Sequence, residues 1–186
     1  MSLAALLGFA YFASEVLLSI SRRSRSKTGV SQDRSTLRAL WIVIIVSVTL
    51  AVHAARHWRF AALSHHDLLD LAAIVLFVAG LAVRWWSIIV LGRFFTVDVT
   101  IEKDHQLIEA GPYQLVRHPS YTGVLLAFVG WGLSLHNWLS LVLLLVPIFI
   151  VFTHRMNVEE DALRGALGER YATYMRRTKR LFPFIY

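Results

Sequence analysis

Long apolar runs separated by short polar segments dominate the chain. Residues 3–20, 39–55 and 68–91 form three such runs, and residues 124–135 and 138–152 form two more. A helix rises about 1.5 Å per residue, so about 20 apolar residues cross the ~30 Å hydrocarbon core of a bilayer. The last two runs are short for this thickness, which predicts tilt or local thinning. The pattern predicts an all-α integral membrane protein with about five transmembrane helices.

Composition supports this fold class. The 186 residues are 56% hydrophobic and 17% charged, which excludes a disordered chain. The sequence has no cysteine, so disulfides, thiolate nucleophiles and thiolate metal sites are excluded together. No polar stretch is long enough to build its own core. We therefore expect a single membrane domain over residues 1–186, with three N-terminal membrane helices within residues 1–91.

The basic residues predict an orientation in the membrane. Of the 19 lysines and arginines, all but Arg56, Arg59 and Arg84 lie in residues 21–38, in residues 92–119 or in the C-terminal tail. With five spans these three segments share one side, which the positive-inside rule makes cytoplasmic. The protein would then lie in the cell inner membrane if its source is bacterial or archaeal. The net charge of +7 is explained by these loops and by anionic lipid headgroups, without nucleic acid.

Two charged residues lie inside apolar runs. Glu15 is costly in lipid, so it should face another helix or a headgroup. Arg84 lies in the last third of its run, and we expect it to extend toward the nearby membrane surface. Neither residue belongs to a motif.

The most motif-rich polar stretch is residues 111–123. Pro112 and Pro119 bracket it, and each proline fixes φ and removes a backbone donor. The residue before a proline is pushed away from helical conformation, so the chain should turn at His118 before a new apolar helix begins. An ordered turn would then present Arg117 and His118 at the membrane edge.

A second polar cluster, residues 155–160, follows the last apolar run. The hairpin from residue 121 to residue 153 enters the bilayer and returns, so its two ends should be neighbours. Glu159 or Glu160 can accept a hydrogen bond from an ammonium group, and Arg117 or Arg155 can form a fork with a carboxylate. The spacing of Leu163, Leu167, Tyr171 and Tyr174 predicts an amphipathic, charged helix over residues 157–177.

Each of these residues also has an ordinary explanation. Glutamates favour helix N-termini, arginines anchor membrane proteins at the cytoplasmic side, and tyrosines form interfacial belts. Their joint placement on both arms of one hairpin favours a functional site. Two other hypotheses are a non-enzymatic scaffold that binds anionic lipid through its basic loops, and a metal site. The candidate metal ligands are His53, His57, His65 and His66.

Six short motifs lie in the C-terminal half of the chain. They are His105-Gln106-Leu107-Ile108, Gly111-Pro112-Tyr113, Arg117-His118-Pro119-Ser120-Tyr121-x-Gly123, Arg155-x-x-x-Glu159-Glu160, Gly168-Glu169-x-Tyr171-x-x-Tyr174 and Pro183-Phe184-Ile185. Together they resemble the isoprenylcysteine carboxyl methyltransferase family, over about residues 92–186. The arginine–histidine–proline motif and the paired glutamates also recur in phospholipid methyltransferases. The resemblance makes residues 92–186 a methyltransferase core.

The resemblance implies S-adenosylmethionine as methyl donor and no metal. Its pocket would face the cytoplasm, between the 92–119 loop and the C-terminal helix. Glu159 would hold the polar end of the cofactor, Arg155 would bind the substrate, and Arg117 is a second candidate partner for a carboxylate. These three residues form the implied catalytic set. The implied cofactor-binding residues are His105, Gln106, Leu107, Ile108, Tyr113, His118, Pro119, Ser120, Tyr121, Glu159 and Glu160.

The implied reaction is carboxyl methylation of an isoprenylcysteine-like acceptor that enters from the bilayer. A carboxylate is already ionised near pH 7, so the protein mainly has to position the reactants and exclude water. The alternative activity is methylation of a phospholipid or another amine. An amine must first lose a proton, for which a glutamate or His118 is the candidate base. Membrane lipids and a lipidic or prenylated acceptor are the expected partners, and nucleic acid is not.

Overall fold

The computed structural model describes residues 2–21, 34–64, 67–95, 106–183 and 185–186. These residues form helices and loops, which confirms the all-α fold class. The α-helices are α1 (Leu3–Ser21), α2 (Arg34–His57), α3 (Asp67–Leu91), α4 (Pro119–Leu133), α5 (Trp138–Leu167) and α6 (Glu169–Arg177). Short 3-10 turns form η1 (Arg59–Ala61), η2 (Gly92–Phe94) and η3 (Gly111–Gln114).

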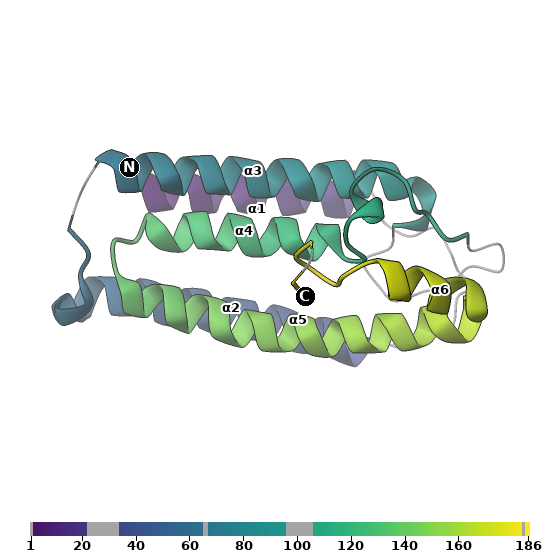
Figure 1. Cartoon of the computed structure of the whole chain (residues 1–186). Helices are drawn as coiled ribbons and strands as arrows, with labels where there is room; N and C mark the ends of the chain where they lie inside the picture. The colour runs from purple at the N-terminus through teal and green to yellow at the C-terminus, as the bar shows by residue number, and fades with distance from the viewer. Residues whose placement is uncertain (1, 22–33, 65–66, 96–105, 184) are drawn as a thin grey trace.

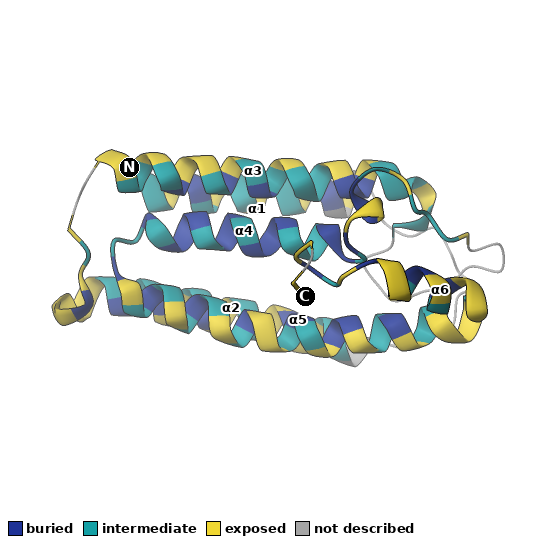
Figure 2. Cartoon of the chain, viewed as in Figure 1, coloured by how far each residue is buried: buried dark blue, intermediate teal, exposed yellow. Residues whose placement is uncertain are grey.

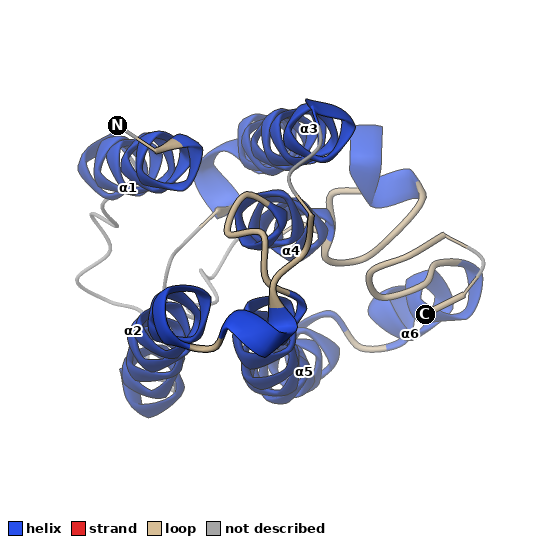
Figure 3. Cartoon of the chain, turned by 90° about the vertical axis from the view of Figure 1, so that its left-hand side faces the viewer, coloured by secondary structure: helices blue, strands red, loops and turns tan. Residues whose placement is uncertain are grey.

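Helices α1 to α5 run side by side, and α6 lies at one end of the bundle (Figure 1). Helices α1, α3 and α5 end there, and α2 and α4 begin there. The helix ends that flank residues 21–38 and 92–119 therefore lie at this end, together with α6. Residues 21–38, residues 92–119 and the C-terminal tail carry most of the basic residues. The turn between α4 and α5 lies at the opposite end. Viewed along the bundle, α4 lies between α3 and α5 (Figure 3). On one side of these three helices, α1 lies beside α3 and α2 lies beside α5.

Helix α4 is short and central, and most of its residues are buried (Figure 2). Its glycines let α3 approach backbone to backbone. A Cβ added at Gly130 would lie 2.5 Å from the carbonyl oxygen of Ala73, and one at Gly123 would lie 2.6 Å from the backbone nitrogen of Arg84. Larger residues at these positions would push α3 and α4 apart. The first turn of α4 is therefore held at a fixed place beside α3.

Three described segments are long and apolar enough to cross a membrane: Thr36–His57, Asp67–Phe94 and Trp138–Leu167. Leu3–Leu18 is a shorter apolar helix, and α4 has 15 residues. The fold is that of an integral membrane protein.

The prediction of a helix over residues 157–177 is confirmed in part: these residues are helical on both sides of Gly168, but they belong to two helices. Helix α5 continues from Trp138 to Leu167 without a break, because no residue after Phe152 interrupts it. The chain reverses at Gly168, whose φ of 56° lies in the left-handed region that glycine adopts without strain. Helix α6 then folds back with Tyr171 and Tyr174 buried.

The two charges inside apolar runs pair with each other. Arg84 on α3 binds Glu15 on α1 through two contacts, Nε to Oε1 at 2.8 Å and Nη2 to Oε2 at 2.9 Å. The expectation that Glu15 faces another helix is confirmed, and the expectation that Arg84 extends to the membrane surface is wrong. A nearby carboxylate offers the guanidinium a stronger partner than a distant headgroup does.

At the end of the bundle opposite α6, polar contacts cap α5 and connect the α4–α5 turn to α3. Asn137 caps α5, since its Oδ1 accepts from the backbone N–H of Ser140 at 3.0 Å. His136 Nε2 lies 3.0 Å from Asp70 Oδ1, which links the α4–α5 turn to α3. The tight helical hairpin expected from the sequence is confirmed.

Candidate active site

The C-terminal segment holds the turn before α4 through its backbone. Arg117 N–H donates to the carbonyl of Lys179 at 2.8 Å, and His118 N–H donates to that of Arg180 at 3.0 Å. The helix then begins at Pro119, where the missing N–H costs no helical hydrogen bond. The side chains of Arg117 and His118 are therefore fixed at the end of the bundle where α6 lies.

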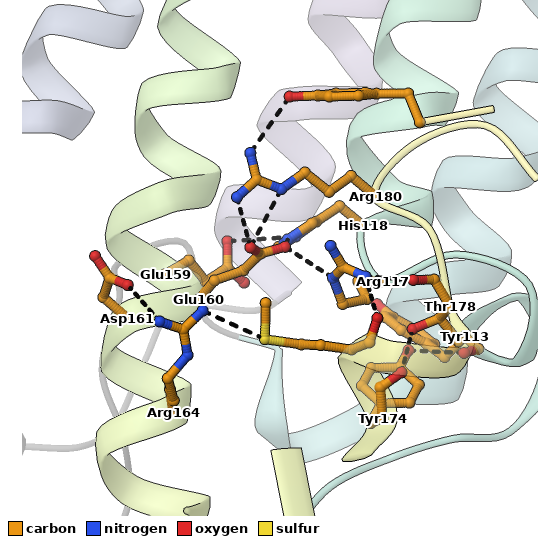
Figure 4. A network of polar contacts seen from close by, with 12 residues as sticks. Tyr113, Arg117, His118, Glu159, Glu160, Asp161, Arg164, Tyr174, Thr178 and Arg180 are labelled. Carbon is orange, nitrogen blue, oxygen red and sulfur yellow. Dashed lines mark hydrogen bonds and ion pairs between the residues drawn. The ribbon is translucent and has the colours of Figure 1, made fainter. Parts of the chain in front are cut away.

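Glu160 is the centre of a closed polar network (Figure 4). Its Oε1 accepts from Arg117 Nε at 2.8 Å and lies 3.0 Å from His118 Nε2. Its Oε2 accepts from Arg180 Nη2 at 2.7 Å, and its side chain is 1% exposed. Arg117 also donates to the backbone carbonyl of Thr178. Glu160 and Arg117 thus join α5, the turn before α4 and the C-terminal segment.

Glu159, the preceding residue, has a different environment. Its side chain is 32% exposed, and its Oε2 accepts from the hydroxyl of Tyr121 at 3.2 Å. The same hydroxyl accepts from Arg155 Nε at 3.0 Å, and Arg155 Nη1 donates to Thr36 Oγ1 at 3.2 Å. His118 Nδ1 lies 3.9 Å from Glu159 Oε2. The prediction that the two ends of the hairpin are neighbours is confirmed.

A cavity of about 220 Å³ lies at the end of the bundle near α6, and His118, Tyr121, Arg155 and Glu159 are among its lining residues. Most of the predicted site residues line it, and they come from the segment before η3, from α4 and from α5. Pro119 and Glu160 are buried but are not among the lining residues, and His105 lies outside the described residues. The predicted residues that line the cavity are Gln106, Leu107, Ile108, Tyr113, Arg117, His118, Ser120, Tyr121, Arg155 and Glu159.

Two tyrosines at this cavity keep their protons at neutral pH. Burial raises the pKa of Tyr174 to about 12, and its hydroxyl donates to the carbonyl of Tyr113 at 2.7 Å. Burial also raises the pKa of the Tyr113 phenol, and the charge of Glu159 adds to the shift. Tyr113 therefore presents a neutral hydroxyl beside the carboxylate of Glu159.

The N-terminal helices contribute lining residues that the motifs missed. Tyr11 and Glu15 from α1, Trp41 from α2 and Arg84 from α3 all line the cavity. The sequence feature that could have indicated these residues is the presence of Glu15 and Arg84 inside apolar runs. Their pairing requires α1 and α3 to be neighbours, which the sequence alone does not establish.

A second cavity of about 500 Å³ adjoins the first. It is lined mainly by apolar side chains of α1 and α2, with Phe77 from α3 and Phe128 from α4 at its back. The residues common to both cavities are Tyr11, Glu15, Trp41 and Ile44.

The alternative metal site gains no support from the described part of the chain. No group of three potential histidine, aspartate or glutamate ligands occurs there. The rings of His53 and His57 stack at 4.4 Å, and His65 and His66 lie outside the described residues.

The first cavity is lined by apolar side chains together with the charged residues Glu15, Arg84, Arg117, Arg155 and Glu159, and we call it the polar cavity. A helical membrane protein in which such a cavity adjoins an almost wholly apolar one is suited to an enzyme that acts on a lipidic molecule. Comparison with known proteins defines the enzyme class. Residues 73–165 match the sequence model of the isoprenylcysteine carboxyl methyltransferase family. The chain belongs to this family, and it is therefore a membrane methyltransferase.

Individual relatives extend the similarity beyond the motifs. Protein-S-isoprenylcysteine O-methyltransferase B of Arabidopsis thaliana is 29% identical over 177 residues, which cover 94% of this chain and 88% of the plant protein. A probable protein-S-isoprenylcysteine O-methyltransferase of Oryza sativa subsp. indica is 30% identical over 145 residues, or 77% and 76% of the two chains. The alignment with the Arabidopsis protein thus includes the N-terminal helices, which carry none of the six motifs.

The fold is also shared with a solved structure. The eukaryotic intramembrane Ras methyltransferase, an isoprenylcysteine carboxyl methyltransferase, superposes with a TM-score of 0.64 at 21% identity. The match covers 100% of this chain and 69% of the other.

Proposed function

We propose that the protein transfers a methyl group from S-adenosylmethionine to the carboxylate of an isoprenylcysteine-like lipid. The observation that carries this proposal is the row formed by Arg155, the Tyr121 hydroxyl and Glu159 in a cavity that adjoins an apolar one. A cation and an anion are held on either side of one hydroxyl. The two ends of this row suit an acceptor carboxylate and a donor ammonium, respectively.

The residues around Glu159 fit the polar end of S-adenosylmethionine. Glu159 is the partly exposed acid of the row, and it would accept from the cofactor's ammonium. The Tyr113 hydroxyl and the ring of His118 border the same part of the cavity. When bound, the cofactor supplies a methyl group on a positively charged sulfur. Pro119 and Glu160 would support this part of the cavity from behind, since they are buried and do not line it.

Arg155 would orient the acceptor. Its side chain is fixed by the hydroxyls of Tyr121 and Thr36, so the planar guanidinium has little freedom to move. A preorganised fork aligns a carboxylate without the entropy cost of ordering a flexible chain. Arg117 is a weaker candidate for this role, because its guanidinium donates to Glu160 and to two backbone carbonyls.

The chain's contribution to the reaction is mainly positional. The acceptor carboxylate needs no base, because it is ionised near neutral pH. Arg155 holds one of its oxygens while the other faces the methyl group, and the apolar cavity receives the prenyl chain. Side chains of α1 and α2 line the junction of the two cavities, so a bound acceptor would cover the charged residues there and strengthen their electrostatic contacts.

The same proposal includes the topology. Five spans, with the N-terminus outside and the active site facing the cytoplasm, follow from the distribution of basic residues. The polar cavity lies at the end of the bundle near α6, where the helices that flank the basic residues 21–38 and 92–119 also end or begin. The chain lacks cysteine, so single cysteines introduced at Ser26 and Arg177 can be labelled specifically. Both should react only after the inner face is opened, and labelling in intact cells would contradict the orientation.

Amine methylation is a second candidate because of the contacts of His118. With its Nε2–H directed at Glu160, Nδ1 faces Glu159 and would accept a proton from an amine. A carboxylate acceptor would not need His118 as a base, because it is already deprotonated.

The chemistry of the product separates the two candidates. Purified protein would be incubated with S-adenosylmethionine labelled in the methyl group and with either an N-acetylated S-prenylcysteine or a lipid amine. An ester releases its label as volatile methanol in alkali, whereas an N-methyl group is stable. We expect base-labile label on the prenylcysteine. Base-stable label on the amine would favour the second candidate, and no transfer to either would contradict both.

A further inference from the structure

The first turn of α4 is held by an arginine from each neighbouring helix. Arg155 on α5 donates to Tyr121, and Arg84 on α3 donates from Nη1 to Ser120 Oγ at 3.2 Å. Ser120 and Tyr121 are consecutive residues, and α4 lies between α3 and α5 (Figure 3). Both arginines line the polar cavity, so they approach the same short stretch of chain from two sides.

Glu15 engages Arg84 as a carboxylate ligand would. Arg84 Nη2 donates to Glu15 Oε2 at 2.9 Å, and Nε lies 2.8 Å from Glu15 Oε1, so both oxygens of the carboxylate face the guanidinium. The two side chains are 12% and 14% exposed, so the pair is largely shielded from water without being sealed off. A carboxylate from a ligand would need the same two nitrogens.

Glu15 and Arg84 lie where the head of a lipidic acceptor would enter the polar cavity. Glu15 lines both the polar and the apolar cavity, and Arg84 lines the polar one. A lipid whose chain occupies the apolar cavity and whose head enters the polar cavity must pass the carboxylate of Glu15. The head of a lipidic carboxylate would therefore arrive where Glu15 already binds Arg84.

We propose that Arg84 is a second anchor for the acceptor's carboxylate, and that Glu15 occupies this anchor until the acceptor displaces it. The inference rests on the proposed function and adds a specificity-determining pair to it. Arg84 and Arg155 would hold the acceptor head between α3 and α5. Glu15 would weaken the binding of every carboxylate by the same competition, so that only lipids with enough buried apolar chain bind well.

The inference predicts a gain of affinity when an acid is removed. Glu15→Gln keeps the size of the side chain and leaves Arg84 without its anionic partner, so a ligand carboxylate can take its place. Wild type and variant would be titrated with an N-acetylated S-prenylcysteine and with its carboxamide, in the presence of S-adenosylhomocysteine to prevent turnover. We expect the variant to bind the carboxylate about tenfold more tightly, the effect of one charge-assisted contact. Its affinity for the carboxamide should change by less than about twofold.

Asp70→Asn is the matched control. It removes an acid from another polar contact, between Asp70 on α3 and His136 in the α4–α5 turn at the opposite end of the bundle. We expect this variant to bind both ligands as wild type does. A similar gain in the control would show a general effect of charge or stability and would overturn the inference. Unchanged or weaker carboxylate binding in a folded Glu15→Gln protein would also overturn it.

A second variant tests the inference if Glu15→Gln does not fold. Arg84→Lys keeps the charge and the partner of Glu15 but loses the fork. Its preference for the carboxylate over the carboxamide should fall at least about fivefold, with unchanged affinity for S-adenosylhomocysteine. An unchanged preference would assign the pair a purely structural role. Failure of wild type to bind either prenylcysteine ligand would contradict the proposed function itself.

Discussion

Two adjacent glutamates divide the site into a closed region and an open one. Glu160 is buried and binds Arg117, His118 and Arg180, so its carboxylate is saturated by the protein itself. Glu159 is partly exposed and accepts a hydrogen bond from the hydroxyl of Tyr121 at the cavity wall. One side chain therefore stabilises the fold, and the other is available to a ligand. A pair of identical residues in a motif can have two unrelated roles.

The same contrast separates the arginines of the site. Arg117 belongs to the closed region, since it donates to Glu160, Met175 and Thr178. Arg155 belongs to the open region, where it donates to the hydroxyls of Tyr121 and Thr36 beside the cavity. Substitutions in the closed region should reduce stability first, and substitutions in the open region should reduce binding or turnover first.

Glu160→Ala should have the largest effect. It leaves the guanidinium groups of Arg117 and Arg180 without their shared anion, and breaking a buried pair in this way costs about 3–5 kcal/mol. We expect a large loss of folded protein, measured by thermal unfolding in detergent. A variant with wild-type stability would show that the closed network does not hold the C-terminal segment.

Arg155→Lys should reduce turnover by roughly a hundredfold, because lysine keeps the charge but cannot align a carboxylate with a planar fork. Affinity for S-adenosylmethionine should stay within about twofold of wild type. Methyl-transfer rates at saturating cofactor measure the effect. Turnover near wild type would remove Arg155 from the acceptor site and favour Arg117.

Tyr121→Phe should have a moderate effect. It removes the hydroxyl that links Arg155 to Glu159 but keeps the ring, which packs 4.8 Å from that of Phe152. One neutral hydrogen bond contributes about 0.5–1.5 kcal/mol, so turnover should fall by about two- to tenfold. Stability measured in parallel should change little, and a loss as large as that of Glu160→Ala would place Tyr121 in the closed region.

Glu169→Gln should have the smallest effect and serves as a control. Glu169 pairs with Arg176 on the exposed face of α6, with side chains 79% and 65% exposed. Exposed ion pairs contribute little because water screens them. Thermal unfolding and cofactor titration should both match wild type. A measurable loss of cofactor binding would indicate that α6 takes part in the site through this face.

The sequence predicted contacts that depend on the hairpin, but not those that depend on how separate helices pack. Tyr121 and Glu159 lie on the two arms of one apolar hairpin, so their proximity follows from chain length alone. The pairing of Glu15 with Arg84 depends on α1 lying beside α3, which no local pattern specifies. The sequence also did not predict that Glu160 is buried and Glu159 partly exposed. Glu160 is buried because the C-terminal segment folds back onto α5 and places Arg180 against its carboxylate.

The most direct test is a calorimetric titration of the purified full-length protein with S-adenosylmethionine, run in parallel on wild type and Glu159→Gln. Gln has nearly the same size as Glu but cannot pair with an ammonium group as an anion. A charge-assisted hydrogen bond is worth about 1.5–3 kcal/mol, so we predict that the variant remains folded and binds roughly tenfold to a hundredfold more weakly. Equal affinities in the two proteins, or no binding by wild type, would contradict the account.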